Sequence, residues 1–283
     1  MSSRLVVEKK DEDQPRLDSE IVIVGAGISG IGMAIELKKR KIDNFILLEA
    51  SDRLGGTWRD NTYPGVAVDI PSFSYSFSFE PNPNWSRLFA PGMEINEYIN
   101  HCADKYDIRR HIRYGAKVEK TLFDPQQSIW TLFLGNKAVL QSRFVVVATG
   151  ILNQPVIPDL KGLQDFRGGM FHTRRWAHDR DLTGQRVAVI GTGASAVQVV
   201  PAIAPVVKQV DVYQRTPIWI APKVDVELSA RTQAIFRALP ILQSMVRFLI
   251  DTGLEIGYLA TTHYKRLPGL TRFAEKNLSL IHI

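Results

Sequence analysis

Two glycine-rich loops, each placed directly after a short apolar run, constrain the fold of this chain more than any other feature. The first loop is GAGISG, Gly25 to Gly30, after the run 21–24; the second is GTGASA, Gly191 to Ala196, after the run 187–190. This order is typical of the βαβ unit that binds a dinucleotide, in which glycines let the backbone approach a pyrophosphate at a helix N-terminus. We therefore predict an α/β fold with two Rossmann-like dinucleotide-binding domains.

The residues predicted to meet the ribose carry opposite charges in the two units. Glu49 follows Gly25 by 24 positions, and Arg215 follows Gly191 by 24 positions. A carboxylate accepts hydrogen bonds from a free ribose diol, whereas a guanidinium pairs with a 2′-phosphate, and Thr216 adds a hydroxyl donor. The first site is thus predicted to bind FAD or NAD, and the second NADP. The alternatives are a solvated strand end at Glu49 and a surface turn at Arg215-Thr216.

The composition permits two ordinary globular domains and excludes several classes of function. The chain has 283 residues, of which 45% are hydrophobic and 23% charged, as in most globular proteins. Its net charge of +6 comes from scattered Lys and Arg, so we predict no nucleic-acid partner. Cys102 is the only cysteine, which excludes an intramolecular disulfide, a CxxC redox pair and a cysteine-rich metal site; we predict no metal.

Neither a signal peptide nor a membrane span is predicted. Residues 8–20 are polar where a signal peptide would be apolar, so residues 1–18 are interpreted as a flexible leader and the protein as cytoplasmic. The apolar stretch 239–260 is interrupted by Pro240, Arg247, Asp251 and Glu255, and we expect a buried or surface helix pair there instead of a span. No feature of the sequence specifies an oligomeric state.

Periodicity predicts the order of elements. Strands are expected at 21–24 and 45–49 around a helix at 29–40, an ordered loop at 60–92, a helix at 93–106, and strands within 116–147 around a Gly135-Asn136 turn. Two prolines, Pro155 and Pro158, mark a boundary. Beyond it we expect strands at 187–190 and 210–213 around a helix at 194–202, then a mostly helical segment, 224–277. The predicted domains are therefore 19–154 and 155–277.

The last six residues, LSLIHI, follow a polar segment without any structural signal. They correspond to the translation of an adapter used in sequencing libraries. We expect residues 278–283 to be a non-native tail, and the natural protein to be longer.

Between the two loops lie two further patterns. Residues 55–69, GGTWRDNTYPGVAVD, resemble the motif that Baeyer–Villiger monooxygenases carry beside the flavin, and residues 166–176, FRGGMFHTRRW, resemble the linker fingerprint FxGxxxHxxxW of that family. The chain departs from the family pattern at Ala177, where Pro or Asp is usual, and at Val66 and Val68, where many members have cysteines. The resemblance covers residues 20–222.

The resemblance implies FAD in the first domain and NADP in the second. Asp69 would hold an active-site arginine that lies outside this chain, and His172 would act in domain movement. Each has a simpler alternative, since Asp69 could cap a turn, Trp58 and Tyr63 could pack in the core, His172 could be a packing residue, and Thr149-Gly150 could end a buried strand. The predicted FAD-binding residues are Gly25, Gly27, Gly30, Glu49, Gly56, Thr57, Trp58, Asp69, Tyr75, Val118, Thr149 and Gly150, and those for NADP are Gly191, Gly193, Ser195, Arg215 and Thr216.

The implied activity is an FAD- and NADPH-dependent oxygenation of a small ketone by O₂. NADPH would reduce FAD, a C4a-peroxyflavin would form, and it would attack the ketone to give an ester or lactone, with the flavin supplying the chemistry. We expect the present chain alone to be incomplete for this reaction. One alternative is a flavin-containing N- or S-monooxygenase, whose fingerprint generally ends in Phe or Tyr where this chain has Trp176. Another is a truncated dinucleotide-binding protein without catalysis.

Overall fold

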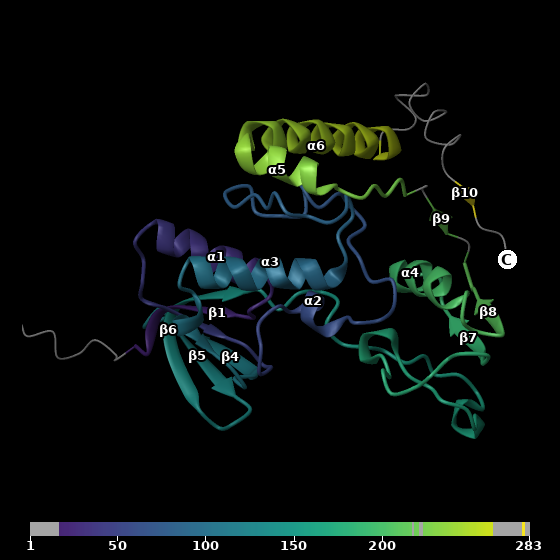
Figure 1. Cartoon of the computed structure of the whole chain (residues 1–283). Helices are drawn as coiled ribbons and strands as arrows, with labels where there is room; N and C mark the ends of the chain where they lie inside the picture. The colour runs from purple at the N-terminus through teal and green to yellow at the C-terminus, as the bar shows by residue number, and fades with distance from the viewer. Residues whose placement is uncertain (1–16, 217, 221–222, 263–278, 281–283) are drawn as a thin grey trace, which may run out of the picture. The chain divides into compact units, whose positions relative to one another are not determined.

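A computed structural model describes residues 17–216, 218–220, 223–262 and 279–280, and the chain separates into two compact units (Figure 1). The first unit comprises residues 1–54 and 106–149, and the second comprises 55–105 and 150–283. The linear domains 19–154 and 155–277 differ from these units, because residues 55–105 pack and hydrogen bond with the part of the chain that follows residue 150. Of the predicted leader, residues 1–16 lie outside the described residues.

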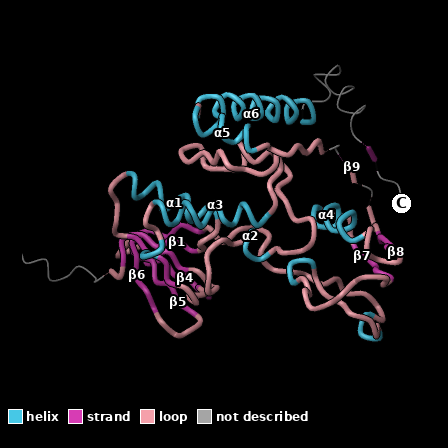
Figure 2. The backbone as a smooth tube through the Cα atoms, in the orientation of Figure 1, coloured by secondary structure: helices cyan, strands magenta, loops and turns pink. Residues whose placement is uncertain are grey.

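The first unit is built on a six-stranded mixed sheet (Figure 2). The strand order is β3-β2-β1-β6-β5-β4. The strands β3, β2, β1 and β6 pair in parallel, and β6, β5 and β4 form an antiparallel meander. The strands are β1 (Ser19–Val24), β2 (Phe45–Leu48), β3 (Ile112–Arg113), β4 (Val118–Asp124), β5 (Ile129–Leu134) and β6 (Val139–Val147).

Helix α1 (Ile28–Lys39) connects β1 to β2 and lies along the sheet. It buries Ile31, Ala34 and Ile35, which recur at helical spacing on one face. A core cluster that includes Val22, Leu48, Leu132 and Leu140 joins the parallel and antiparallel parts of the sheet. The predicted βαβ unit at the first glycine loop, the meander and the turn at 135–136 are all present.

The second unit combines the segment 55–105 with a second, smaller βαβ unit. The segment contains α2 (Thr57–Asp60) and α3 (Gly92–Lys105), separated by irregular but ordered chain as expected. The βαβ unit consists of β7 (Arg186–Ile190), α4 (Ala194–Ile203) and β8 (Gln209–Tyr213), with the two strands parallel. A short 3-10 helix, η3 (Thr173–Arg175), precedes it.

The region predicted to be mostly helical, 224–277, is helical only in its central part. Residues 224–229 are not helical, because Val226 and Leu228 exchange backbone hydrogen bonds with the strand-like segment at Ser86 and Leu88. Two helices follow, α5 (Ala230–Ala238) and α6 (Pro240–Thr262), and residues 263–277 lie outside the described residues. Of the predicted tail, Ser279–Leu280 (β10) are described, and they pair antiparallel with β9 (Trp219–Ile220).

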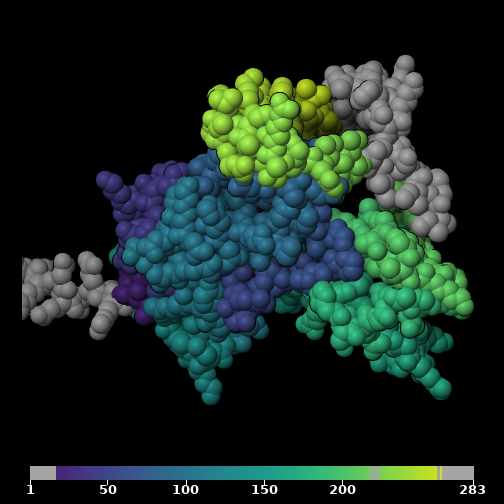
Figure 3. Space-filling model, viewed as in Figure 1, coloured from purple at the N-terminus to yellow at the C-terminus, as the bar shows by residue number. Residues whose placement is uncertain are grey.

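Helix α6 is continuous in spite of the residues that interrupt its apolar sequence. Pro240 is its first residue, where a missing N–H costs nothing, and Arg247 and Asp251 form an ion pair one turn apart (3.4 Å). Figure 3 shows its side chains at the surface, and Phe248 and Leu249 are more than half exposed. Within the described residues no single helix is long and apolar enough to cross a membrane; α5 with residues 240–259 passes that test only as a pair bent by 106°.

Candidate functional site

The first glycine loop closes tightly over the ends of β1 and β6. Gly25 has a φ of +106°, and its N–H donates to the carbonyl of Leu48 (2.8 Å). A Cβ on Gly25 would lie 2.5 Å from the carbonyl oxygen of Ala148, and a Cβ on Gly30 would lie 1.9 Å from the carbonyl oxygen of Gly25. Both positions therefore require glycine, one for the turn and the other for the packing of α1 against the strand.

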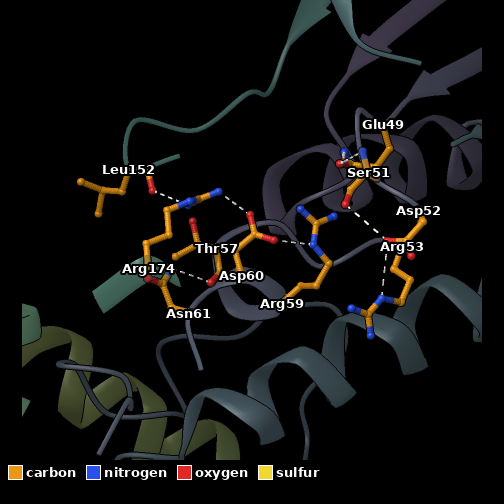
Figure 4. Close-up of polar contacts among 11 residues, drawn as sticks. Glu49, Ser51, Asp52, Arg53, Thr57, Arg59, Asp60, Asn61, Leu152 and Arg174 are labelled. Carbon is orange, nitrogen blue, oxygen red and sulfur yellow. Dashed lines mark hydrogen bonds and ion pairs between the residues drawn. The ribbon is translucent and has the colours of Figure 1, made fainter. Parts of the chain in front are cut away.

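The side chain of Glu49 forms a hydrogen bond to the backbone of this loop. Its side chain is buried, with the residue 6% exposed. Oε2 accepts a hydrogen bond from the N–H of Ala26 (2.9 Å), and Oε1 accepts one from the N–H of Ser51 (2.9 Å; Figure 4). Glu49 is thus no solvated strand end. Both oxygens of the carboxylate are therefore held by backbone amides, one of them in the first glycine loop.

The second glycine loop repeats the geometry of the first. Gly191 also has a φ of +106°, and its N–H donates to the carbonyl of Tyr213 (2.9 Å). Gly27 and Gly193 are the N-caps of α1 and α4, and neither helix start is capped by a side chain. Among the residues that the structure describes, and apart from the adjoining chain, no heavy atom lies within 4 Å of a Cβ built on Gly191 or Gly193. Each loop therefore presents helix N-terminal amides of the kind that bind a phosphate.

The equal spacing of 24 positions does not give Glu49 and Arg215 equivalent places. In the first unit Val24 pairs with Leu48, so Gly25 stands opposite Glu49. In the second unit Ile190 pairs with Tyr213, so Gly191 stands opposite Gln214. The second βαβ unit is one residue shorter between its paired strand ends. Arg215 lies one position and Thr216 two positions beyond Gln214, and both residues are exposed.

The segment predicted to lie beside the flavin begins with two strained glycines. Gly55 and Gly56 have φ values of +122° and +56°, and a Cβ on Gly55 would lie 2.1 Å from Oδ1 of Asn96. Thr57 and Trp58 then open α2. The Nε1–H of Trp58 donates to the hydroxyl of Tyr75 (3.1 Å), and the two rings meet edge to face. Trp58 and Tyr75 therefore form one aromatic pair.

Asp69 lies near this pair. Its side chain is exposed. Burial raises the pKa of Tyr75; the hydrogen bond from Trp58 opposes this rise, and the negative charge of Asp69 adds a smaller increase. The Tyr75 hydroxyl is consequently protonated over the ordinary pH range. The structure thus brings three predicted residues together, Trp58, Asp69 and Tyr75.

The YPG part of the same segment packs against α4. Gln198 of α4 accepts a hydrogen bond from the hydroxyl of Tyr63 (3.0 Å) and donates to the carbonyl of Ala67 (2.9 Å). Gly65 has a φ of +82°, and a Cβ there would lie 2.6 Å from the carbonyl oxygen of Gln198. Tyr63 is buried in one cluster with Val199 and Ile203. The flavin-side segment is thereby fastened to the helix that begins at the second glycine loop.

His172 caps the short helix of the linker fingerprint. Its Nδ1 accepts a hydrogen bond from the N–H of Arg174 (3.1 Å), so the proton of a neutral ring is on Nε2. The side chain of Arg174 reaches Asp60 of α2 and the carbonyl of Leu152 (2.7 Å; Figure 4). In this structure His172 therefore caps η3, and the capping bond fixes the tautomer of its neutral ring.

The two units divide the predicted site residues between them. The first unit carries Gly25, Gly27, Gly30, Glu49, Val118 at the start of β4, and Thr149 beyond the end of β6. Val118 packs against the core cluster of the sheet, and the backbone N of Thr149 lies 3.4 Å from a Cβ built on Gly25. The second unit carries Gly56, Thr57, Trp58, Asp69, Tyr75, Gly150, His172, Gly191, Gly193, Ser195, Arg215 and Thr216.

Three residues that organise the second unit were missed by the sequence interpretation. Asp60 and Arg174 occupy variable positions of the two motifs, and Gln198 lies beyond the glycine loop. In the sequence, the only sign of such a role is that Asp60 and Arg174 are charged residues within otherwise fixed patterns. Their contacts span 114 positions for Arg174 with Asp60 and 131 for Gln198 with Ala67, and spacing along the chain does not reveal such pairs.

Comparison with known proteins gives consistent matches. A profile of the family described as "Pyridine nucleotide-disulphide oxidoreductase" matches residues 22–248. A "Baeyer-Villiger monooxygenase" of Streptomyces coelicolor is 41% identical over 95% of this chain and 52% of the relative, and one of Pseudomonas aeruginosa is 45% identical over 93% and 49%. This chain therefore spans about half the length of the curated relatives it matches.

Solved structures agree with the sequence relatives. "Oxidized steroid monooxygenase bound to NADP" has a TM-score of 0.72 and 38% identity, covering 78% of this chain and 43% of that one. The structure of "OTEMO complex with FAD and NADP (form 3)" has a TM-score of 0.73 and 33% identity, covering 86% and 46%. The similarity therefore extends to the fold of proteins that hold both nucleotides.

Proposed function

Because the chain belongs to the pyridine nucleotide-disulphide oxidoreductase family, and its relatives are Baeyer-Villiger monooxygenases, we propose that it binds FAD and NADPH for the oxygenation of a ketone. The observation that carries the proposal is the pair of glycine loops. Both have the same φ at the first glycine, the same hydrogen bond to the neighbouring strand and an uncapped helix start. Two such loops in one chain fit two dinucleotides.

The first loop fits FAD. Its amides and the N-terminus of α1 would hold the pyrophosphate, and Glu49, already fixed by two backbone amides, would accept the ribose hydroxyls. Gly25 leaves space where a Cβ would meet the end of β6. We assign Gly27, Gly30, Val118, Thr149 and Gly150 to the same site.

The second loop fits NADPH. Gly191, Gly193 and Ser195 would hold the pyrophosphate, and the exposed Arg215 and Thr216 would bind the 2′-phosphate. This assignment does not need Arg215 to match Glu49, because a 2′-phosphate extends beyond the ribose hydroxyl that it replaces.

The residues of the flavin-side segment would orient the reactants. Gly56 and Thr57 would offer backbone amides. Trp58 would give a flat ring surface, held in place by the edge-to-face contact with Tyr75 and the hydrogen bond to its hydroxyl. Asp69 would hold an arginine of the complete protein, and His172 would act in movement of the linker. When bound, FAD supplies the transfer of electrons from NADPH to O₂, and the protein supplies orientation and the exclusion of water.

The proposal gives a ketone and O₂ as the other reactants, an ester or lactone as the product, and the cytoplasm as the location. Sequence relatives that are monooxygenases support a small-molecule substrate and O₂. The proposed domain assignment is FAD to residues 19–154 and NADP to residues 155–277, and residues 55–105 of the first range pack within the second unit.

The test compares nucleotides on the flavin-loaded protein. We expect NADPH to bleach the flavin absorbance faster than NADH, and Arg215→Ala to lower this preference about 10- to 100-fold, the loss of a charge-assisted phosphate contact. Arg186→Ala, at another exposed arginine of the same βαβ unit, is the control and should keep the preference. Equal bleaching of the unaltered protein by both nucleotides would contradict the assignment. With the full gene, conversion of sulfides but not of ketones would contradict the proposed reaction.

A further inference from the structure

One carboxylate in the second unit binds two arginines from different motifs. Oδ1 of Asp60 accepts a hydrogen bond from Nε of Arg59 (2.6 Å), and Oδ2 accepts one from Nη2 of Arg174 (Figure 4). Asp60 and Arg59 belong to α2, directly after Trp58, whereas Arg174 belongs to the linker fingerprint, two residues after His172. The pair of Asp60 and Arg174 is therefore a direct bond between the two motifs.

Arg174 also binds the chain that follows β6. Its Nη1 donates to the carbonyl of Leu152 (2.7 Å), while Nη2 is the atom that meets Asp60. The two nitrogens of one rigid guanidinium thus hold two segments at a fixed separation. The backbone N–H of the same residue binds Nδ1 of His172. Arg174 consequently joins three segments that carry predicted site residues.

The environment of these groups separates this contact from an ordinary surface ion pair. The side chains of Arg59, Arg174 and Asp60 are 11%, 15% and 22% exposed. Exposed pairs contribute little because water and side-chain entropy offset the attraction. Partial burial and shared hydrogen bonds strengthen the attraction and make the loss of one partner costly. Removing Arg174 would leave the carbonyl of Leu152 and one oxygen of Asp60 without this donor.

We propose that Arg174 is a positioning residue that fastens the linker fingerprint to α2 through Asp60, and so sets the place of His172 and of residues 150–152 relative to Trp58. The inference rests on the proposed function only where it concerns NADPH. If the linker acts in nucleotide binding, its release should weaken the binding of NADPH more than it slows the bleaching of the flavin by bound NADPH. The fastening itself is a property of the contacts and does not depend on the reaction.

The first measurement follows hydrogen exchange of backbone amides in the flavin-loaded full chain. Arg174→Gln and Asp60→Asn should each speed the exchange of the amides of residues 173–176 about tenfold, the effect of losing one charge-assisted hydrogen bond. Arg175→Gln removes the same charge from the adjacent, exposed residue and should leave exchange unchanged. The double variant should exchange no faster than Arg174→Gln, because that substitution already removes the bond between Arg174 and Asp60. Equal exchange in Arg174→Gln and Arg175→Gln would overturn the proposal.

The second measurement separates positioning from general stability. In Arg174→Gln we expect the KM for NADPH to rise about tenfold. The flavin content and the maximal rate of flavin bleaching should change less than about twofold, because a positioning residue affects nucleotide binding more than the step after it. An equal loss of both parameters, or an unchanged KM with faster exchange, would overturn the positioning role. If NADPH fails to bleach the flavin even in the unaltered protein, the proposed function fails, while the exchange measurement still decides whether Arg174 fastens the linker.

Discussion

At the scale of single residues, glycines serve two different purposes in this chain. Gly25 and Gly191 have the same positive φ, which shapes a loop open to a ligand. Gly65 also has a positive φ, and the carbonyl oxygen of Gln198 lies where its side chain would be, as the carbonyl oxygen of Ala148 does at Gly25. Gly25 and Gly191 thus shape the two glycine loops, whereas Gly65 allows the flavin-side segment to pack against α4.

Replacing Gly65 by alanine tests this distinction. Left-handed backbone costs a non-glycine residue about 1–2 kcal/mol, and the overlap with the carbonyl of Gln198 should add about 1–3 kcal/mol. Gly184→Ala is a matched control, because Gly184 has a φ of +68° and, within the described part of the chain, only its own chain neighbours lie within 4 Å of its Cβ position. We expect Gly65→Ala to lower the free energy of unfolding in urea clearly more than Gly184→Ala. Equal losses would show that the α4 contact is not tight.

At the scale of elements, α3 shows how one helix face stabilises the irregular chain before it. Tyr98 and Cys102 stand one turn apart on its buried face. The hydroxyl of Tyr98 donates to the carbonyl of Glu80 (2.7 Å) and accepts from the N–H of Phe77 (2.9 Å). Burial, the largest cause, raises the pKa of Tyr98 and raises that of the Cys102 thiol to about 11. This face therefore favours the protonated forms of both groups.

The raised thiol pKa predicts a loss of stability at alkaline pH. Below the ordinary thiol pKa of 9.0, the thiol is protonated in both the folded and the unfolded chain. The protonated thiol then makes its full contribution to the free energy of unfolding. Between pH 9.0 and about 11 the unfolded chain releases the proton first, and stability falls by up to about 2–3 kcal/mol. Urea unfolding across this window should show a smaller fall for Cys102→Ser, since serine does not titrate there. If the stability of that variant fell by the same amount, the fall would be due to other titrating groups, Tyr98 among them.

At the scale of the whole molecule, the order of segments along the chain differs from their order in space. The chain leaves the first unit after Leu54, returns at Tyr106 and leaves again after Thr149. The segment 55–105 is therefore part of the second unit, although it precedes four strands of the first, β3 to β6.

This division predicts which regions lose protection together. In the Gly65→Ala variant, hydrogen exchange should become faster in the amides of α2, η3 and α4, which belong to the second unit. Exchange in β1, β2 and β6 should change much less. If the amides of α2 instead kept the protection of β1, the segment 55–105 would belong energetically to the first unit.

The sequence by itself determined the local βαβ units and the class of site. Apolar runs, glycine loops and helix periodicity act over short distances along the chain, so β1–α1–β2 and β7–α4–β8 were predicted within a residue or two. The motifs at 55–69 and 166–176 likewise indicated the family that the relatives confirm.

Only the tertiary structure decided how these parts fit together. Strand register placed Gln214, not Arg215, opposite the second loop, because the length of the connecting helix and turns is read only from the paired strands. Gln198 with Ala67 and Arg174 with Asp60 join positions more than 100 apart along the chain. Such pairs depend on which surfaces pack, and packing is a property of the folded chain that no local pattern encodes.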